Sequence, residues 1–173
     1  MSPAADPSRV LERVDAPDPI NDLMKPSTIL VVDDEFYTAE ILTFVLEAQG
    51  FRVLGAFNGR DALEKLKLTE VDLIILDVMM PIMDGAEMSR VLQADVKLAT
   101  IPLLVTSALS ETTVRGMFTH LDGFLRKPFL METVVARVEE LLMKPRPGNG
   151  IEASDAEEAE GAERRQRSGL NGA

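Results

Sequence analysis

Five short apolar segments, separated by segments with helical periodicity, constrain the fold of this chain more than any other feature. In the first interval, Ala39, Leu42, Val45 and Leu46 recur at helical spacing and fall on one face. Strands that are apolar along their whole length are covered on both faces, which is typical of a parallel sheet between helices. The apolar segments are TILVV, RVLGAF, DLIILD, PLLVTS and GFLRK. We therefore predict an α/β fold in which a five-stranded parallel sheet is doubly wound by helices through right-handed crossovers.

Turn and cap residues set the ends of the predicted helices. Gly50 supplies a stop for the first helix, Asn58 a cap for the second and Ser110 a cap for the fourth. The MDG segment that ends at Gly85 is interpreted as the cap of the third helix. The core-facing residues predicted for the third and the last helix are Met88, Val91, Leu92, Leu130, Val134, Val138, Leu141 and Leu142.

The sequence predicts one folded domain between two tails. Residues 1–26 are rich in Pro, Asp and Ala, and we expect a flexible N-terminal arm with one weakly amphipathic segment, SRVLERV. Residues 27–144 contain the five βα units. Residues 145–173 hold few large apolar residues, so we expect a disordered low-complexity tail. The acidic run in this tail, followed by RRQR, is explained by solvation, and a docking segment stays the alternative.

The composition excludes several classes of protein. With no cysteine, the chain has no disulfide, no thiol nucleophile and no thiolate metal site. A formal net charge of −11 does not favour binding to nucleic acid or to anionic membranes. No apolar segment is long enough to span a membrane, and the first residues lack the features of a signal peptide. We therefore expect a cytoplasmic protein that contacts neither nucleic acid nor membrane directly.

Polar residues stand at the carboxyl ends of four of the predicted strands. In an open α/β sheet, ligands bind at this edge, beside the point where the strand order reverses. For five strands in the order 2-1-3-4-5, that point lies between the first and the third strand. The strand-end residues are Asp33, Asp34, Asp77, Thr106, Ser107, Lys127 and Pro128. The sequence therefore predicts a functional site at this edge.

The chemistry of such a site follows from its residue types. Three carboxylates, those of Asp33, Asp34 and Asp77, would repel one another unless a cation lies between them. Oxygen ligands without Cys or His favour a hard divalent ion such as Mg²⁺. Asp77 could then act as a nucleophile on phosphorus, while Lys127 and the hydroxyl of Thr106 stabilise the phosphoryl oxygens. Taken alone, the Asp33-Asp34 pair is also explained as the cap of the following helix.

Four segments resemble the receiver domain of two-component response regulators. They are ILVVDDE, LIILDVMMPIMDG, IPLLVTSA and GFLRKPF, in the order and spacing of that family. The resemblance covers about Thr28 to Met143. It implies a (βα)5 flavodoxin-like fold with strand order 2-1-3-4-5.

The same resemblance implies how a phosphoryl group and a metal ion are held. Asp77 would be the phosphoacceptor. Mg²⁺ would be bound by Asp77, by Asp34 directly, by Asp33 mainly through water, and by the backbone carbonyl of Met79. The side chain of Met79 is then free to vary.

The resemblance further implies which residues respond to phosphorylation. Thr106 would be the switch hydroxyl and Phe124 the switch aromatic residue. Lys127 would bind the phosphate, and its peptide bond to Pro128 would be cis.

These observations favour a phosphorylatable receiver without an output domain. A sensor histidine kinase or a phosphotransfer protein would supply the phosphoryl group, and the domain would catalyse only its own phosphorylation and dephosphorylation. The signal would pass to an unidentified output protein through a phosphorylation-dependent contact, from a monomer or a phosphorylation-dependent dimer. The alternative within binding modules is a phosphorylation-independent scaffold or localisation module that acts through its tails.

A phosphatase with an aspartate nucleophile is the alternative from another class. Such enzymes usually carry a second aspartate two residues after the nucleophile, and here that position is Met79, which cannot transfer a proton. The side chains of Met79 and Ala108 also cannot hydrogen-bond a water that attacks the phosphoryl group, which predicts slow self-dephosphorylation. His120, the single histidine, is interpreted as a surface residue.

Overall fold

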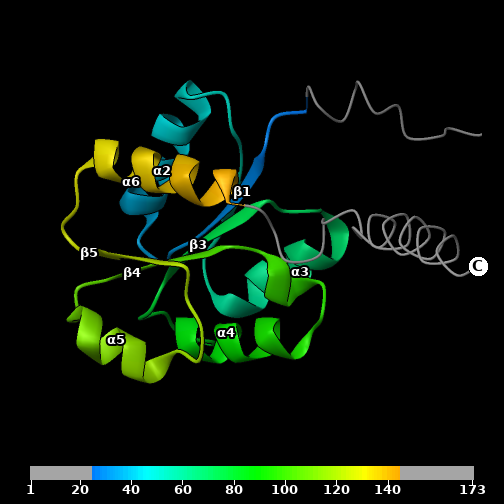
Figure 1. Cartoon of the computed structure of the whole chain (residues 1–173), viewed down its shortest axis with the longest axis vertical. Helices are drawn as coiled ribbons and strands as arrows, with labels where there is room; N and C mark the ends of the chain where they lie inside the picture. The colour runs from blue at the N-terminus through cyan, green and yellow to red at the C-terminus, as the bar shows by residue number, and fades with distance from the viewer. Residues whose placement is uncertain (1–24, 145–173) are drawn as a thin grey trace, which may run out of the picture.

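The computed structural model describes residues 25–144 of the chain (Figure 1). The predicted N-terminal arm and low-complexity tail lie outside these residues, apart from Lys25 and Pro26.

All five strands of the structure belong to one parallel sheet. The strands are β1 (Thr28–Val32), β2 (Arg52–Ala56), β3 (Leu73–Asp77), β4 (Leu103–Ser107) and β5 (Gly123–Arg126). Their order in the sheet is β2-β1-β3-β4-β5, and every neighbouring pair is parallel. The predicted fold and strand order are therefore confirmed.

Helices cover both faces of the sheet. They are α2 (Phe36–Ala48), α3 (Gly59–Leu68), α4 (Gly85–Ala94), α5 (Glu111–Met117) and α6 (Met131–Met143), with a short 3₁₀ helix η1 (Leu98–Thr100) before β4. Figure 1 shows α2 and α6 together on one face and α3, α4 and α5 on the other. This arrangement explains the continuous apolar sequences of the three central strands β1, β3 and β4, because every residue in them is buried, whereas the edge strand β2 is only partly buried.

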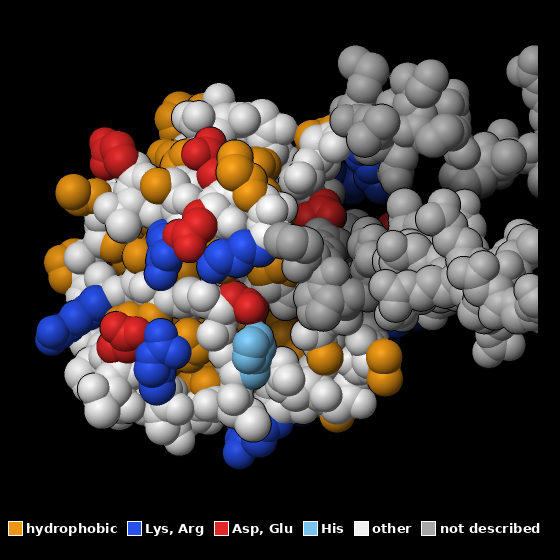
Figure 2. Space-filling view, in the orientation of Figure 1, with side chains coloured by type: hydrophobic (Ala, Val, Ile, Leu, Met, Phe, Trp, Pro, Cys, Tyr) orange, Lys and Arg blue, Asp and Glu red, His pale blue; other side chains and the backbone are white. Residues whose placement is uncertain are grey.

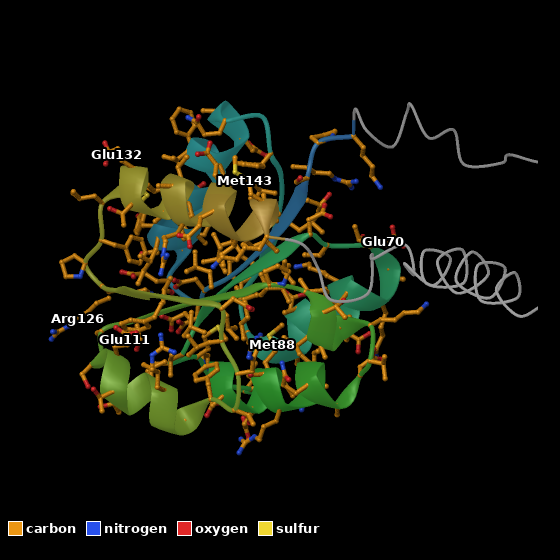
Figure 3. The ribbon with its side chains drawn as sticks, in the orientation of Figure 1. Glu70, Met88, Glu111, Arg126, Glu132 and Met143 are labelled. Carbon is orange, nitrogen blue, oxygen red and sulfur yellow. The ribbon has the colours of Figure 1, made fainter. Side chains whose placement is uncertain are left out.

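The core consists of two apolar clusters, one on each face of the sheet. Along β1, Leu30 and Val32 belong to the cluster under α3 and α4, whereas Ile29 and Val31 belong to the cluster under α2 and α6. Met88 of α4 is fully buried in the first cluster and points between its helix and the sheet (Figure 3). The alternation of β1 is that of a strand, in which successive side chains point to opposite faces.

The predicted helix starts are confirmed by their capping bonds. The side chain of Asn58 accepts a hydrogen bond from the backbone N–H of Asp61, and that of Ser110 accepts one from Thr113. Asp84 and Glu87 form a capping box at the start of α4, so the MDG segment is the cap of that helix, as predicted.

Two residues predicted to face the core are exposed. Val91 of α4 is 43% exposed, because it lies beside the Met88–Leu92 stripe and not within it. Leu130 is 71% exposed, because it is the N-cap residue of α6 and precedes the first turn of the buried face. Within residues 25–144 no helix is long and apolar enough to cross a membrane.

Candidate functional site

Polar residues from four strands meet at the carboxyl edge of the sheet. Asp77 is the last residue of β3 and pairs in register with Thr106 of β4. Asp33 follows β1 and Lys127 follows β5, and both are held by backbone bonds, from Asp33 N–H to Ala56 at 3.1 Å and from Lys127 N–H to Ser107 at 2.8 Å. The predicted convergence of Asp33, Asp77, Thr106 and Lys127 is therefore present.

The ammonium of Lys127 bridges two carboxylates. Its Nζ lies 2.7 Å from Oδ2 of Asp33 and 2.7 Å from Oδ1 of Asp77. The remaining oxygens accept backbone hydrogen bonds, Asp33 Oδ1 from Glu35 at 2.9 Å and Asp77 Oδ2 from Met79 at 2.8 Å. Every carboxylate oxygen of the pair thus has a donor, which allows both side chains to be buried.

Burial changes the proton affinity of this cluster. It raises the pKa of the Asp77 carboxyl above its ordinary value, and the charge of Asp33 acts in the same direction, while Lys127 and the N–H of Met79 oppose part of the effect. Burial also lowers the pKa of the Lys127 ammonium. Its bonds to Asp33 and Asp77 outweigh that effect, and the net pKa lies above the ordinary value.

The hydroxyl of Thr106 has no partner. Thr106 is 1% exposed, and its Oγ1 is the one buried side-chain oxygen or nitrogen in residues 25–144 without a hydrogen bond. A buried hydroxyl without a partner costs about 1–3 kcal/mol. Its position beside Asp77 in the register of β3 and β4 makes it a donor available to a group bound there.

Not all the predicted site residues lie in this cluster. Asp34 is exposed, and within residues 25–144 its carboxylate does not join those of Asp33 and Asp77 in one group. The expected convergence of three carboxylates is thus not found, because Lys127 joins Asp33 and Asp77 while Asp34 points to solvent. Met79 is 64% exposed. Phe124 of β5 is half-buried and packs against the core cluster under α3 and α4.

Gly85 supports the site in a way that the sequence did not reveal. A Cβ on Gly85 would lie 2.4 Å from the carbonyl oxygen of Asp77 and 3.0 Å from Cα of Val78. The N–H of Gly85 donates to the carbonyl of Val78 at 2.9 Å, so α4 begins directly against the end of β3. The sequence signal at this position is the MDG segment, which by itself predicts only a helix cap.

The donors at this edge suit a hard cation. Asp33 and Asp77 present carboxylate oxygens, and no sulfur or imidazole ligand lies with them among residues 25–144. Oxygen donors of this kind select Mg²⁺ or a similar ion. In this structure the positive charge of Lys127 Nζ holds the two carboxylates together. The peptide bond between Lys127 and Pro128 is cis, as predicted.

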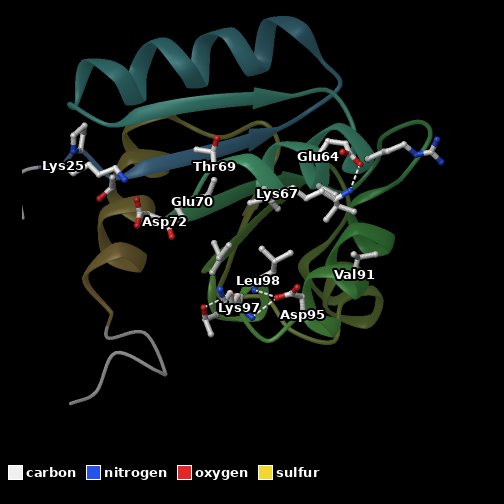
Figure 4. Close-up of a pocket in the computed structure, with 18 residues that line it drawn as sticks. Lys25, Glu64, Lys67, Thr69, Glu70, Asp72, Val91, Asp95, Lys97 and Leu98 are labelled. Carbon is white, nitrogen blue, oxygen red and sulfur yellow. Dashed lines mark hydrogen bonds and ion pairs between the residues drawn. The ribbon is translucent and has the colours of Figure 1, made fainter. Parts of the chain in front are cut away.

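Two other features lie away from this cluster. A hollow at the amino edge of the sheet is lined by residues of α3, α4 and η1 (Figure 4). Several of its charges have partners, such as Lys67 with Glu64 at 2.8 Å, and none of the predicted site residues lines it. His120 is exposed and lies 3.1 Å from Asp122, in agreement with its interpretation as a surface residue.

Comparison with known proteins identifies the family of this fold. Residues 29–139 match the family described as the response regulator receiver domain. The DNA-binding response regulator MtrA of Mycolicibacterium paratuberculosis is 35% identical over 133 residues, which are 75% of this chain and 58% of that protein. This chain thus spans somewhat more than half the length of that relative.

Solved structures give the same result. The signal receiver domain of a histidine kinase from Syntrophus aciditrophicus is 35% identical, with a TM-score of 0.63, and covers 75% of this chain and 96% of its own. The response regulator TrrA of Thermotoga maritima, solved in complex with Mg²⁺ and BeF, is 30% identical with a TM-score of 0.60. That comparison covers 66% of this chain and 98% of TrrA.

Proposed function

This chain belongs to the receiver-domain family of two-component response regulators, and we propose that within it Asp77 accepts a phosphoryl group. The observation that carries this proposal is the position of Asp77. Its carboxylate ends β3 at the switch point of the sheet, with the Lys127 ammonium 2.7 Å away and the partnerless Thr106 hydroxyl in register beside it. A nucleophile, a cation and a hydrogen-bond donor are the groups that phosphoryl transfer requires.

In this proposal one oxygen of Asp77 attacks phosphorus, and the bond from phosphorus to the donor breaks. The donor is a histidine kinase or a phosphotransfer protein. The Lys127 ammonium already lies within hydrogen-bonding distance of the Asp77 carboxylate, so it would stabilise the negative charge on the phosphoryl oxygens. Thr106 would donate its free hydroxyl to one of those oxygens.

Receiver domains bind Mg²⁺, and the donors found here fit that ion. We assign it to Asp33, Asp34, Asp77 and the backbone carbonyl of Met79. When bound, it would offset the charge of the carboxylates and of the phosphoryl oxygens. The exposed side chain of Asp34 is compatible with this role because it lies next to Asp33 in the chain and is free to turn toward the site.

Phosphorylation would change the surface around β4 and β5. A phosphoryl group on Asp77 gives Thr106 an acceptor, and its movement toward that acceptor would leave space for Phe124, which pairs in register with Val105 next to Thr106. The altered surface would then contact another protein. MtrA is named as a DNA-binding protein and is longer than this chain, and our expectation of a protein contact as the output stays a prediction.

The proposal is tested by phosphorylation of the purified chain with acetyl phosphate and Mg²⁺. Intact mass spectrometry should show a gain of one phosphoryl group in the wild-type protein and none in Asp77→Asn. Asp95→Asn is the matched control, because Asp95 is an exposed aspartate beyond the end of α4 that only caps backbone N–H groups. Base-labile, acid-stable phosphate on Asp77→Asn would contradict the assignment of the acceptor.

The same experiment separates the receiver from its main alternative. A phosphorylation-independent scaffold would take up no phosphoryl group and would show no spectral change with beryllium fluoride and Mg²⁺. Steady release of phosphate from a small phosphomonoester would instead favour a phosphatase.

A further inference from the structure

The helix α2 carries a row of large apolar side chains on its solvent face. Tyr37 is 75% exposed, Ile41 50% and Phe44 75%, and Phe36 at the start of the helix is 53% exposed. The opposite face of α2 packs against the core, where Leu42 and Leu46 are almost fully buried. Contiguous exposed apolar patches of this kind mark surfaces that bind another segment or protein.

The spacing of this row fits a helical or extended partner. Tyr37, Ile41 and Phe44 are separated by four and three residues, so they form one seam along the helix. Glu40 and Glu47 flank that seam on one side, and neither forms an ion pair within residues 25–144. In Figure 2 hydrophobic side chains gather over the layer that Figure 1 shows to be α2 and α6. The surface therefore presents an apolar seam with one acidic border.

We propose that residues 8–14 of the same chain, the segment SRVLERV, dock on this seam. With helical periodicity Val10, Leu11 and Val14 share one face. Arg9 and Arg13 lie together on one flank of that face, where they would meet Glu40 and Glu47. The segment thus matches the seam in both its apolar face and its charge.

The length of the chain permits this contact. The backbone of Ser27, just before β1, accepts a hydrogen bond from Arg52, so the start of the domain lies beside the loop that follows α2. Eleven residue steps separate Val14 from Lys25, which span at most about 36–40 Å. The 13 residues of α2 extend over only about 20 Å. Residues 8–14 can therefore reach any part of the seam.

The residues after α6 fit the seam less well. Their acidic run, EASDAEEAEGAE, would face the acidic border of α2 and repel it. Residues 145–173 contain only Ile151 and Leu170 as large apolar residues, and these are 19 positions apart. Charge and apolar content both favour the N-terminal segment as the occupant.

The fluorescence of the single tyrosine can report this contact. The chain has one tyrosine and no tryptophan, and that tyrosine is Tyr37 in the middle of the seam. Acrylamide quenching of tyrosine fluorescence in the full chain therefore reports how far the seam is covered. Leu11→Asp should raise the quenching constant, by about twofold if the segment is docked in half of the molecules. Ala5→Asp, which adds the same charge outside the segment, should leave it unchanged.

A charge exchange tests the acidic border separately. Arg9→Glu with Arg13→Glu should raise the quenching constant, and adding Glu40→Lys with Glu47→Lys should restore the protection. Equal quenching in the wild type and in Leu11→Asp would overturn the proposal. Protection that is lost on dilution would also overturn it, since the segment would then belong to a second copy. Neither measurement needs phosphorylation or Mg²⁺, so its result is independent of the role proposed for Asp77.

Discussion

The ammonium of Lys127 lies 2.7 Å from Asp77 and 2.7 Å from Asp33, so one cation holds together two carboxylates from different strands. The strands involved, β1 and β3, are neighbours at the switch point of the sheet, and Lys127 reaches them from beyond β5. One positive charge does not balance two negative ones. The cluster is therefore an incomplete electrostatic site, and its properties should respond to removal of any of the three charges.

Asp77→Asn should stabilise the unphosphorylated protein at neutral pH. The pKa of Asp77 is raised above the ordinary value of 3.8, with burial as the largest cause. For an acid whose folded pKa is raised, the favourable contribution to stability is present below the unfolded value and is lost as pH rises through the folded value. The ionised carboxylate therefore lowers the free energy of unfolding at pH 7, and the amide removes that cost.

Urea denaturation at two pH values measures this effect. The gain of Asp77→Asn over the wild type should be present at pH 7. It should shrink as the pH falls through the raised pKa of folded Asp77 and vanish below 3.8, where the carboxyl is neutral in both the folded and the unfolded state. A wild-type protein that is more stable than Asp77→Asn at pH 7 would contradict the prediction. Asp95→Asn serves again as the control for loss of an exposed charge.

Lys127→Ala should destabilise the protein, because it leaves two buried carboxylates without their cation. Removing one partner of a fully buried ion pair costs about 3–5 kcal/mol, and we expect roughly 1–3 kcal/mol here because Lys127 is partly exposed. The pKa of Lys127 is raised, so its contribution is fully present below the unfolded value of 10.5 and is lost as pH rises through the folded value. The difference between wild type and variant should therefore shrink only above that pH.

A double variant tests whether the loss comes from the unpaired carboxylates. Lys127→Ala combined with Asp77→Asn should lose less stability than Lys127→Ala alone, since one of the two negative charges is gone. Equal losses would show that the aliphatic stem of Lys127 matters and its charge does not. Lys127→Ala should still bind Mg²⁺, which can be measured from the change in Phe or Tyr fluorescence as Mg²⁺ is added.

The convergence of the site residues was predictable from the sequence, whereas their side-chain contacts were not. The strand ends and the strand order determine that Asp33, Asp77 and Lys127 meet at one edge. Whether a lysine bridges two carboxylates depends on side-chain torsions that no local pattern encodes. For the same reason the sequence placed Asp34 with the other two, although its side chain is exposed.

The loop after β3 shows a second limit of sequence reasoning. Gly85 is needed because the path of this loop brings it against the carbonyl of Asp77, and that proximity depends on the packing of α4. Ile82 adopts a φ of 71°, which a β-branched residue rarely does, and no residue pattern in MMPIMDG predicts this backbone conformation. Periodicity predicts which elements form, but tight contacts between their ends require the three-dimensional path.

Thr106→Val should stabilise the unphosphorylated protein by about 1–2 kcal/mol, because it removes a buried hydroxyl that has no partner and keeps its shape. Thr106→Ser is the matched control. It keeps the hydroxyl and loses a buried methyl group, so it should be less stable than the wild type. Chemical denaturation of the three proteins decides the point. A loss of stability in Thr106→Val would mean that the hydroxyl has a partner, such as a bound water.

Gly85→Ala should destabilise the protein by about 1–3 kcal/mol, because the added Cβ would overlap the carbonyl of Asp77, which is backbone and cannot turn away. Gly116 of α5 offers the matched control, since a Cβ there meets nothing within 4 Å. Gly116→Ala should gain about 0.5–1 kcal/mol from the better helix propensity of alanine. Equal effects of the two substitutions would contradict the close approach at Asp77. Relief of this overlap would displace the backbone of Asp77, so Gly85→Ala should also slow phosphorylation by acetyl phosphate.

The phosphorylated protein should lose its phosphoryl group slowly in the absence of a phosphatase. Met79 lies two residues after Asp77 and Ala108 two after Thr106, and neither side chain can hydrogen-bond a water that attacks phosphorus. Met79→Gln should shorten the lifetime, because the amide can orient such a water. Its side chain is 64% exposed and only its backbone N–H bonds to Asp77, so the substitution should leave the fold intact. Met143→Gln, at a methionine that is 82% exposed on α6, is the control. Loss of phosphate followed by mass spectrometry gives the rates, and a wild-type half-life of seconds at neutral pH would refute the prediction.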